Sequence, residues 1–473
     1  MPNKSIPGIV VSGLRGGSGK TILSLCLIAS WHKKGLKIIP FKKGPDYIDA
    51  GWLAYAAHHP CFNLDLFMMH PELIQNSFIS HSKGAEVVLI EGNRGLYDGV
   101  DHQGTYSTAQ LAKLLRTPVL LTVDCTKATN TVAAMVLGCQ KMDPKVSIGG
   151  VILNKIATGR QELLIRKAIN NTCRLPVLGA IPRFKKDPFP ERHMGLTPFQ
   201  EHLDVEKSIA YVRGIGAKYL DLDGIWKLAN EAKDIKDIKE GEKGRRGELK
   251  VHGGQLKIGI IKDSAFQFYY PENLTELEKR GVKLIKVSPL KESRLPDIDA
   301  LYIGGGFPET HAIALSKNTG FRKSLRQAIE RGLPVYAECG GLIYLGKSLI
   351  LKGRKYPMTG IFPIVFGMEK KPQAHGYTII KVKKANPFFP QNITLKGHEF
   401  HYSRITEMKE KDGIDMAFKV QRGKGLKSGM DGICYKNVLA TYTHLHALGS
   451  PEWTEGLIKC SIKFKKKRKK ENR

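Results

Sequence analysis

Short runs of aliphatic and β-branched residues alternate with helical patterns over residues 1–226. The apolar runs predict strands at 9–11, 37–41, 86–90, 118–123, 148–153 and 177–181. Polar residues gather just after these runs, and the stretch 22–31 is typical of a helix that stops at Gly35. Such alternation predicts a parallel sheet with helices on both faces and ligands at the carboxyl ends of the strands.

A second α/β pattern begins at residue 257. It predicts a helix at 275–280 and strands at 257–262, 283–287, 300–303, 334–337 and 438–443. Between the two patterns, residues 227–256 are charged, contain glycine and have few large apolar side chains, which is typical of a linker. We therefore expect an α/β protein with domains at 1–226 and 257–460, joined by this linker and followed by a basic tail at 461–473.

The segment 13–21, GLRGGSGKT, links the first predicted strand to the first helix. A glycine-rich turn in this context, opening on Gly-Lys-Thr, is typical of a phosphate-binding loop. Backbone N–H groups and the helix N-terminus attract phosphate oxygens, while the lysine reaches the outer phosphates and the threonine hydroxyl binds Mg²⁺. The predicted nucleotide-binding residues are Gly16, Gly17, Ser18, Gly19, Lys20 and Thr21. Leu14 departs from the usual glycine spacing, which leaves open an accidental turn.

Acidic residues follow two further strands of the first domain. Glu91 and Asp98 come after the strand at 86–90, and Asp46 and Asp49 lie in a glycine-proline loop after the strand at 37–41. Carboxylates placed beside a phosphate loop can hold Mg²⁺ directly or through water. The alternative is that these carboxylates cap helices or turns.

Cys339 stands between the strand at 334–337 and a helix that starts at 342. Small neighbours on either side permit the sharp turn of a nucleophile elbow. The Gly340 N–H can face a developing oxyanion, and the loop 304–306 can offer a second donor. A cysteine nucleophile needs a base, which we expect far away in the sequence. Candidates are His375, His398, His401, His444 and His446, each of which can instead be a structural residue.

Composition and charge narrow the class of protein. The chain has 473 residues, 42% of them hydrophobic, and none of its apolar runs approaches the roughly 18 residues of a membrane span. We expect no secretory signal. The 8 cysteines form no CxxC pair, which argues against a disulfide framework or a zinc site and for a reducing cytoplasm.

The formal net charge is +31, and part of it lies in the end of the chain, KFKKKRKKENR, at 463–473. We expect this tail to be a solvated, disordered extension. The remaining basic residues are spread along the chain without an aromatic-interleaved stripe, so nucleic-acid binding is not favoured as the main function. A basic cleft suits a polyanionic substrate equally well.

The sequence closely resembles the cobyrinate a,c-diamide synthase family of corrinoid-pathway amidotransferases, over nearly the whole chain except the linker and the tail. The motifs that carry the resemblance are KKGPDYID (42–49), NLD (63–65), EGNRGLYDG (91–99), STAQLAKLL (107–115), PERHMGL (190–196), FYYPENL (268–274), GGGFPE (304–309), PVYAECGGL (334–342), GHEFHYS (397–403) and YTHLH (442–446). The resemblance implies a dethiobiotin-synthetase-like ATP-binding domain joined to a class I-like glutaminase domain. It also accounts for Leu14, because the family's phosphate loop has the longer glycine spacing.

The same resemblance implies roles for individual residues. Cys339 becomes the glutaminase nucleophile and His444 the residue that activates it, in preference to His446. The expected oxyanion donors are Gly305, Gly306 and Gly340. Because the sequence after these histidines has no glutamate where a Cys-His-Glu triad requires one, the resemblance implies a dyad. In the other domain it implies ATP and Mg²⁺ as cofactors, Thr21, Asp46 and Glu91 as metal ligands, and Asp46, Tyr47, Asp49 and Asp98 as residues that handle phosphate or substrate.

The function implied is ATP- and glutamine-dependent amidation of the a and c carboxylates of cobyrinate through an acyl phosphate. Its partners are then small molecules, with no membrane, and a homodimer is one candidate assembly. Hydrogenobyrinate and nickel-sirohydrochlorin remain alternative substrates. Outside this class, Arg15–Thr21 also resembles the signature of a partition-type ATPase switch, and a non-catalytic scaffold using the basic tail is a third alternative.

Overall fold

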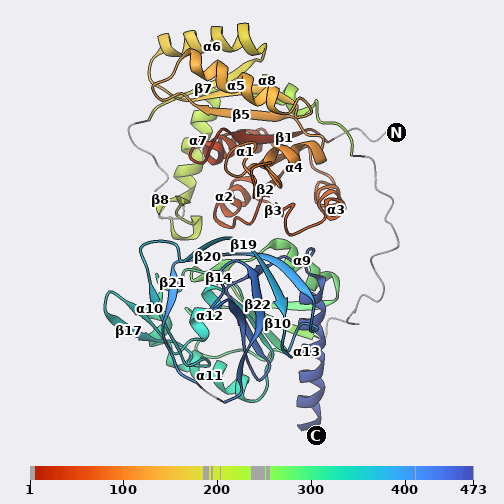
Figure 1. Ribbon diagram of the computed structural model, residues 1–473, viewed down its shortest axis with the longest axis vertical. Coiled ribbons are helices and arrows are strands. Elements are labelled where there is room, and N and C mark those ends of the chain that lie inside the picture. Colours follow the sequence, from red (N-terminus) through yellow and green to blue (C-terminus); the bar gives the residue numbers. More distant parts are fainter. Residues whose placement is uncertain are drawn as a thin grey trace. The chain divides into compact units, whose positions relative to one another are not determined.

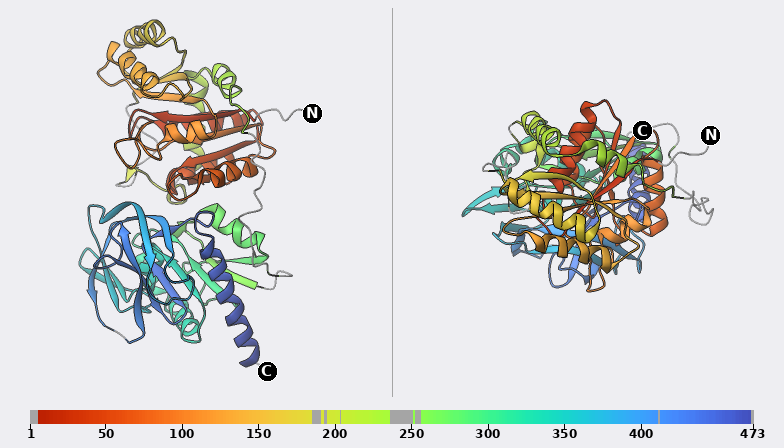
Figure 2. Two further views of the ribbon diagram at one scale, coloured as in Figure 1. Left: turned by 45° about the vertical axis from the view of Figure 1, so that its right-hand side comes forward. Right: turned by 90° about the horizontal axis from the view of Figure 1, so that it is seen from above.

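The computed structural model describes residues 6–184, 191–192, 195–202, 204–235, 251, 256–410 and 412–471. Most of the expected linker, at 236–250 and 252–255, lies outside the described residues, as do parts of the motif at 190–196. The chain divides into two compact units, 1–240 and 241–473. Figures 1 and 2 show their elements, and each unit is described by itself.

The first unit is built on a parallel sheet in the order β3-β2-β4-β1-β5-β6-β7. Its strands are β1 (Gly8–Gly13), β2 (Ile38–Lys43), β3 (Phe62–Leu64), β4 (Val87–Glu91), β5 (Val119–Asp124), β6 (Ile148–Ile156) and β7 (Val177–Pro182). A small antiparallel pair, β8 (Glu191–Arg192) and β9 (Gly195–Leu196), lies outside this sheet. The predicted parallel α/β fold is therefore confirmed, with β3 added at one edge.

Helices flank this sheet (Figure 1). They are α1 (Lys20–Lys33), α2 (Ile48–Ala57), α3 (Pro71–His81), α4 (Thr108–Leu114), α5 (Asn130–Met142), α6 (Gly159–Cys173), α7 (Val205–Tyr219) and α8 (Leu222–Ala229), with a 3₁₀ turn at Phe199–Glu201. Helix α1 packs against α7, and α5 packs against α6. The sheet positions the site, because β1 lies between β4 and β5 with Val11 opposite Glu91. The loop after β1 and the end of β4 therefore meet at one edge.

The second unit has a mixed sheet in the order β12-β10-β13-β15-β24-β23-β22-β19-β20-β25. The strands of this sheet are β10 (Leu256–Ile261), β12 (Val282–Val287), β13 (Ala300–Ile303), β15 (Val335–Glu338), β19 (Ala374–Val382), β20 (Thr394–His401), β22 (Ile414–Arg422), β23 (Met430–Tyr435), β24 (Val438–Thr441) and β25 (His444–Leu445). Pairing is parallel from β12 to β24 and antiparallel from there on.

Two smaller sheets and short helices complete this unit. One sheet pairs β11 (Phe266–Phe268) with β14 (Gly305–Gly306), and the other contains β16 (Ser348–Leu351), β17 (Arg354–Pro357), β18 (Ile364–Met368) and β21 (Ser403–Met408). The helices are α9 (Pro271–Lys279), α10 (Ala312–Lys317), α11 (Thr319–Glu330), α12 (Gly340–Leu345) and α13 (Pro451–Glu471).

Side chains of the central strands alternate between two hydrophobic cores, one on each face of the large sheet. Leu301, Ile303, Val335 and Ala337 belong to one core, whereas Tyr302 and Tyr336 belong to the other. This period of two follows from the pleat of a strand. It also assigns the side chains at the end of β15 to opposite faces.

The expectation of a disordered tail at 463–473 is wrong for residues 463–471, which continue helix α13. Buried Trp453, Leu457 and Ile458 anchor the first turns of this helix in the core. Further along, Lys465 and Arg468 form ion pairs with buried Asp299, at 3.2 and 3.0 Å. This strongly basic segment is therefore helical because one face of the helix forms ion pairs with acidic residues. Residues 472–473 lie outside the described part.

Candidate active sites

The phosphate loop between β1 and α1 is held open by left-handed glycines. Gly17 and Gly19 have φ values of 72° and 93°, which residues with a side chain adopt at a cost. A Cβ atom on Gly19 would lie 2.1 Å from the Asn154 side-chain nitrogen. That same amide donates to the Ser18 carbonyl at 2.9 Å, so the end of β6 fixes the loop. The Ser18 hydroxyl closes the loop on itself by donating to the Arg15 carbonyl at 3.0 Å.

Lys20 and Thr21 leave this loop at the first turn of α1. The Lys20 ammonium donates to the Arg15 carbonyl at 3.0 Å. Burial, together with the nearby Lys42 charge, lowers the pKa of Lys20. The Thr21 hydroxyl donates to Glu91 Oε1 at 3.0 Å, which joins the predicted threonine and glutamate in one site.

Lys42 lies at the centre of the acidic residues that follow β2 and β4. Its ammonium is 2.6 Å from Glu91 Oε1, 2.7 Å from Asp49 Oδ2 and 3.5 Å from Asp46 Oδ2, and the side chain is only 2% exposed. Burial opposes its charge, but the three carboxylates outweigh burial and raise the pKa of Lys42. Burial and the neighbouring Asp49 raise the pKa of Asp46 to about 7. The structure thus brings three of the predicted acidic residues together around a cation that the sequence did not single out.

The other predicted residues of this domain have structural contacts. Asp98 accepts a hydrogen bond from the Gly95 N–H at 2.8 Å and so shapes the loop after β4. Asp46 Oδ1 accepts from the N–H groups of Ile48 and Asp49, both at 3.0 Å, as the capping alternative expects. Tyr47 occupies the N-terminal cap position of α2.

The oxygen donors beside the phosphate loop fit Mg²⁺. Glu91 Oε2 is buried and has no hydrogen-bond partner among the described residues, and Oε1 contacts the Thr21 hydroxyl. The described residues contain no group of three or more His, Cys, Asp or Glu side chains that could hold a metal ion. Mg²⁺ bound with a nucleotide takes most of its ligands from phosphates and water, so two protein oxygens are sufficient.

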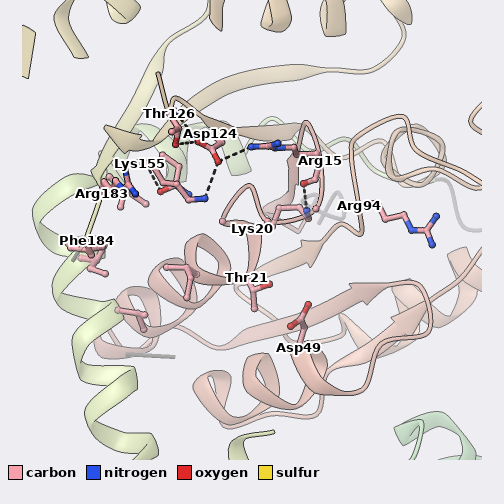
Figure 3. A pocket seen from close by; sticks show the side chains of 18 of the residues that line it. Arg15, Lys20, Thr21, Asp49, Arg94, Asp124, Thr126, Lys155, Arg183 and Phe184 are labelled. Carbon is pink, nitrogen blue, oxygen red and sulfur yellow. Dashed lines mark hydrogen bonds and ion pairs between the residues drawn. The ribbon is translucent and has the colours of Figure 1, made fainter. Parts of the chain in front are cut away.

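A cavity of about 750 Å³ opens over the phosphate loop. Arg15, Lys20, Thr21, Lys42, Asp46 and Asp49 line it together with Asp124, Lys155, Phe184 and Tyr211. Figure 3 shows the Arg15 and Lys155 side chains converging on Asp124, at 3.3 and 3.0 Å. Burial alone would raise the pKa of Asp124, but hydrogen bonds from Thr126 and Lys155 outweigh burial and hold this pKa below its usual range. The cavity therefore combines cationic, acidic and apolar surface beside a phosphate-binding loop.

In the second unit, Cys339 has the strained backbone of a nucleophile elbow. It precedes α12 with φ 48° and ψ −98°, a conformation that costs a non-glycine residue of order 1–3 kcal/mol. The turn is possible because its neighbours are glycines. A Cβ atom on Gly341 would lie 2.6 Å from the Ile303 carbonyl oxygen, and one on Gly340 would lie 2.9 Å from the Gly306 nitrogen. The backbones of Gly306 and Gly340 therefore approach closely next to the thiol.

His444 is the histidine candidate that interacts with this cysteine. Burial alone would lower its pKa, but its hydrogen bonds with Cys339 and Glu338 raise the pKa of His444 to about 10. Its ring also lies against Gly305, where a Cβ atom would be 2.6 Å from His444 Cε1. Neighbouring His398 stacks on this ring at 4.8 Å between centroids, and burial lowers its pKa well below the usual value.

The remaining histidine candidates contact other groups. His401 stacks on Tyr442 at 3.6 Å, His375 stacks on Phe400 at 4.3 Å, and His446 lies 3.6 Å from Glu272. These contacts agree with the alternative of structural roles.

Sequence reasoning missed several residues of both sites. Lys42 lies inside the motif at 42–49, of which the prediction includes only Asp46, Tyr47 and Asp49. Asn154 directly follows the predicted strand at 148–153, where polar residues were expected, and lies near the end of the longer strand β6, so that signal was available. Glu338 directly precedes the cysteine, whereas a third triad member was sought only after the histidines. Its Oε2 lies 3.3 Å from His444 Nδ1.

Two families match successive parts of the chain. Residues 9–196 match the family described as "CobQ/CobB/MinD/ParA nucleotide binding domain", and residues 257–452 match "CobB/CobQ-like glutamine amidotransferase domain". The chain therefore consists of a nucleotide-binding domain followed by a glutamine amidotransferase domain. The description of the first family includes MinD and ParA proteins, which explains why the phosphate loop resembles that of a partition ATPase. A partition ATPase alone would not account for the glutamine amidotransferase domain at 257–452.

Full-length relatives define the class further. The cobyrinate a,c-diamide synthase of Magnetococcus marinus is 41% identical over 454 residues, 96% of this chain and 97% of the relative. That of Archaeoglobus fulgidus is 38% identical over 461 residues, 97% of this chain and 98% of the relative. The chain belongs to the cobyrinate a,c-diamide synthase family and is a ligase that hydrolyses glutamine. None of its described helices is long and apolar enough to cross a membrane.

Proposed function

We propose that this enzyme uses ATP and glutamine to amidate the a and c carboxylates of cobyrinate. The observation that carries the proposal is the pairing, in one chain, of a phosphate loop beside Glu91 with a Cys339 elbow beside His444. A nucleotide site alone indicates many classes of enzyme. A strained cysteine with a histidine partner in a glutamine amidotransferase domain adds a source of ammonia. The substrate is taken from the names of the full-length relatives.

In the glutaminase half, the Cys339 sulfur attacks the side-chain amide carbon of glutamine. The thiol proton passes to His444, which then gives it to the leaving nitrogen, so the carbon–nitrogen bond breaks, ammonia departs and a thioester remains. Water then attacks the thioester, which releases glutamate and regenerates the thiol. The Gly340 N–H, at the start of α12, and those of Gly305 and Gly306 are the donors proposed for the oxyanion.

In the synthetase half, a substrate carboxylate oxygen attacks the γ-phosphorus of ATP, giving an acyl phosphate and ADP. Lys20 and the loop N–H groups bind the phosphates. Thr21 and Glu91 would hold Mg²⁺, which when bound would offset the negative charge of the phosphates. Ammonia then displaces phosphate from the acyl carbon and leaves an amide. Asp46, Asp49 and Asp98 are proposed to position substrate or phosphate, with Asp46 also a candidate metal ligand.

Replacing the nucleophile separates the two halves. Cys339→Ala is expected to abolish glutamine-dependent amidation and to leave amidation from added ammonium salt within about threefold of wild type, since the phosphate loop is untouched. The measurement is product formation with each nitrogen source. Retention of glutamine use would refute the role of Cys339, and loss of both activities would refute the division of labour.

The substrate is tested by offering the candidate tetrapyrroles one at a time. The protein is incubated with ATP, Mg²⁺, glutamine and either cobyrinate, hydrogenobyrinate or nickel-sirohydrochlorin, and products are identified by mass spectrometry. We expect two successive replacements of a hydroxyl by an amino group on cobyrinate. Amides on another tetrapyrrole alone would transfer the function to that substrate, and no amide on any of the three would refute the proposal.

A further inference from the structure

Glu338 is a fully buried carboxylate whose oxygens are occupied by named partners. Oε1 accepts hydrogen bonds from the Tyr336 hydroxyl at 3.2 Å and the Leu445 N–H at 3.1 Å. Oε2 accepts from the Tyr302 hydroxyl at 3.1 Å and lies 3.3 Å from His444 Nδ1. Burying a carboxylate is costly unless its lone pairs are satisfied, and here donors approach both oxygens.

The strand pleat explains why this residue reaches the histidine. Glu338 is the last residue of β15 and shares a face with Tyr336, which is paired in register with Tyr302 of the neighbouring strand. Cys339 follows on the other face and turns sharply into α12. Because β15 and β24 are parallel, with Glu338 opposite Thr441, the chain that leaves β24 brings His444 back to the end of β15.

We propose that Glu338 is the positioning residue of the glutaminase site: it holds His444 with the proton on Nδ1 and so directs Nε2 to Cys339. This inference rests on the glutaminase role proposed above for Cys339 and His444. The carboxylate also stabilises the imidazolium form, which donates its proton to the leaving nitrogen, so that this nitrogen departs as ammonia. It supplies, from the residue before the nucleophile, the third group that the sequence after the histidine lacks.

The chemistry of the neighbouring groups supports a positioning role. His398 stacks on His444 but is buried with a strongly lowered pKa, so it adds no positive charge that would compete for the carboxylate. The two tyrosines and the Leu445 amide fix the carboxylate plane before any substrate binds. A fixed acceptor of this kind costs little reorganisation during the reaction.

The Glu338→Gln substitution tests the proposal with almost no change of shape. The amide oxygen can still accept from Leu445, but the amide nitrogen then faces Nδ1 with a donor, which favours the wrong histidine tautomer. We expect kcat for glutamine hydrolysis to fall on the order of 10²- to 10⁴-fold with a KM within about threefold. Amidation from ammonium salt is expected to stay within about twofold, because the phosphate-loop unit is untouched, and the retained KM for glutamine verifies that the unit carrying the substitution is folded.

The pH profile distinguishes positioning from a merely structural role. The groups that face His444 are Cys339, Glu338, His398 and His401. Loss of the Glu338 charge destabilises the imidazolium, so the basic limb of kcat/KM for glutamine is expected to move to lower pH by about one unit or more. A structural defect lowers the plateau and leaves the limb in place. An unshifted limb therefore overturns the proposal, even if the rate falls.

Two tyrosine variants complete the design. Tyr302→Phe removes a hydrogen-bond donor from Glu338 Oε2, which makes that oxygen a better acceptor for His444. We therefore expect the basic limb to move to higher pH. This variant provides the test if Glu338→Gln does not fold. Movement to lower pH in Tyr302→Phe overturns the proposal. Tyr344→Phe is the matched control, because this buried hydroxyl, on the helix after Cys339, makes no hydrogen bond within the described part of the chain.

The design keeps this inference separate from the function on which it rests. If Cys339→Ala retains glutamine use, the proposed glutaminase site is wrong. If Cys339→Ala loses glutamine use while Glu338→Gln keeps the wild-type rate and profile, only the role of Glu338 is wrong.

Discussion

Lys42 is the residue on which the charge balance of the synthetase site depends. Its single ammonium faces Asp46, Asp49 and Glu91, so the cluster has a negative formal charge when all three acids are ionised. Burial and neighbouring charge raise the pKa of both Glu91 and Asp46. The site therefore has spare negative charge beside the phosphate loop, which favours the arrival of a cation.

The Lys42→Met substitution is expected to show how strongly this charge balance holds the first unit together. Removing one partner of a buried ionic cluster costs about 3–5 kcal/mol of unfolding free energy. The loss is expected to be smaller at pH 6 than at pH 8. The reason is that carboxylates with raised pKa values, Asp46 at about 7, take up protons as the pH falls and relieve their repulsion. Calorimetry of the full chain at the two pH values measures the effect, and an equal loss at both would contradict it.

Some residues of these two sites could be predicted from the sequence. The phosphate loop and the Cys339 elbow are local patterns, in which strand, turn and helix follow one another within about ten residues. The contact of Glu338 with His444 was not accessible, because it joins positions separated by 106 in the chain through the pairing of β15 with β24. Lys42 illustrates a different failure, since the pattern of buried aliphatic residues gives no reason to bury a lysine.

At the scale of elements, buried aliphatic strands were predicted well and mixed ones were not. Strands such as β1 and β4 are buried throughout, and their sequences contain continuous apolar runs that end in polar residues. The three-residue strand β3 has an asparagine at its centre and was missed. Strand β19 alternates buried and half-buried positions over much of its length and includes histidine and glycine, so it lacked the expected signal as well.

Helix α13 gives the prediction that belongs to this scale. Arg468 pairs with Asp299, which is 1% exposed, and also with Asp297 at the surface. We expect Arg468→Ala to lower the unfolding free energy of the second unit by about 1–2 kcal/mol. This is less than for a fully buried pair, because Arg468 is about a third exposed and Lys465 remains with Asp299.

The matched control for this prediction is Lys466→Ala, which removes the same charge from an exposed position of α13 and is expected to change stability by less than about 0.5 kcal/mol. Thermal unfolding of both variants gives the comparison. Equal effects would mean that only the net charge of the helix matters.

At the scale of the whole molecule, the two units contain separate chemistries. The residues of the phosphate-loop cavity all come from the first unit, and the contacts described above for Cys339, His444 and Glu338 lie within the second. Each of the two proposed half-reactions therefore draws its named side chains from a single unit. In the proposed mechanism ammonia alone couples the two halves, so a defect in one half is expected to leave the chemistry of the other half intact.

Lys20→Ala tests this separation in the first unit, as Cys339→Ala does in the second. Removing the phosphate-loop ammonium is expected to lower amidation on the order of 10²-fold or more with either nitrogen source, because both routes need the activated carboxylate. Glutamine hydrolysis, measured as glutamate released without the tetrapyrrole, is expected to stay within about twofold. Lys33→Ala, at the exposed end of the same helix, is the control and should leave both activities unchanged. If Lys20→Ala also abolished hydrolysis, the glutaminase would depend on an occupied nucleotide site, and the two units would be coupled by more than the ammonia that passes between the reactions.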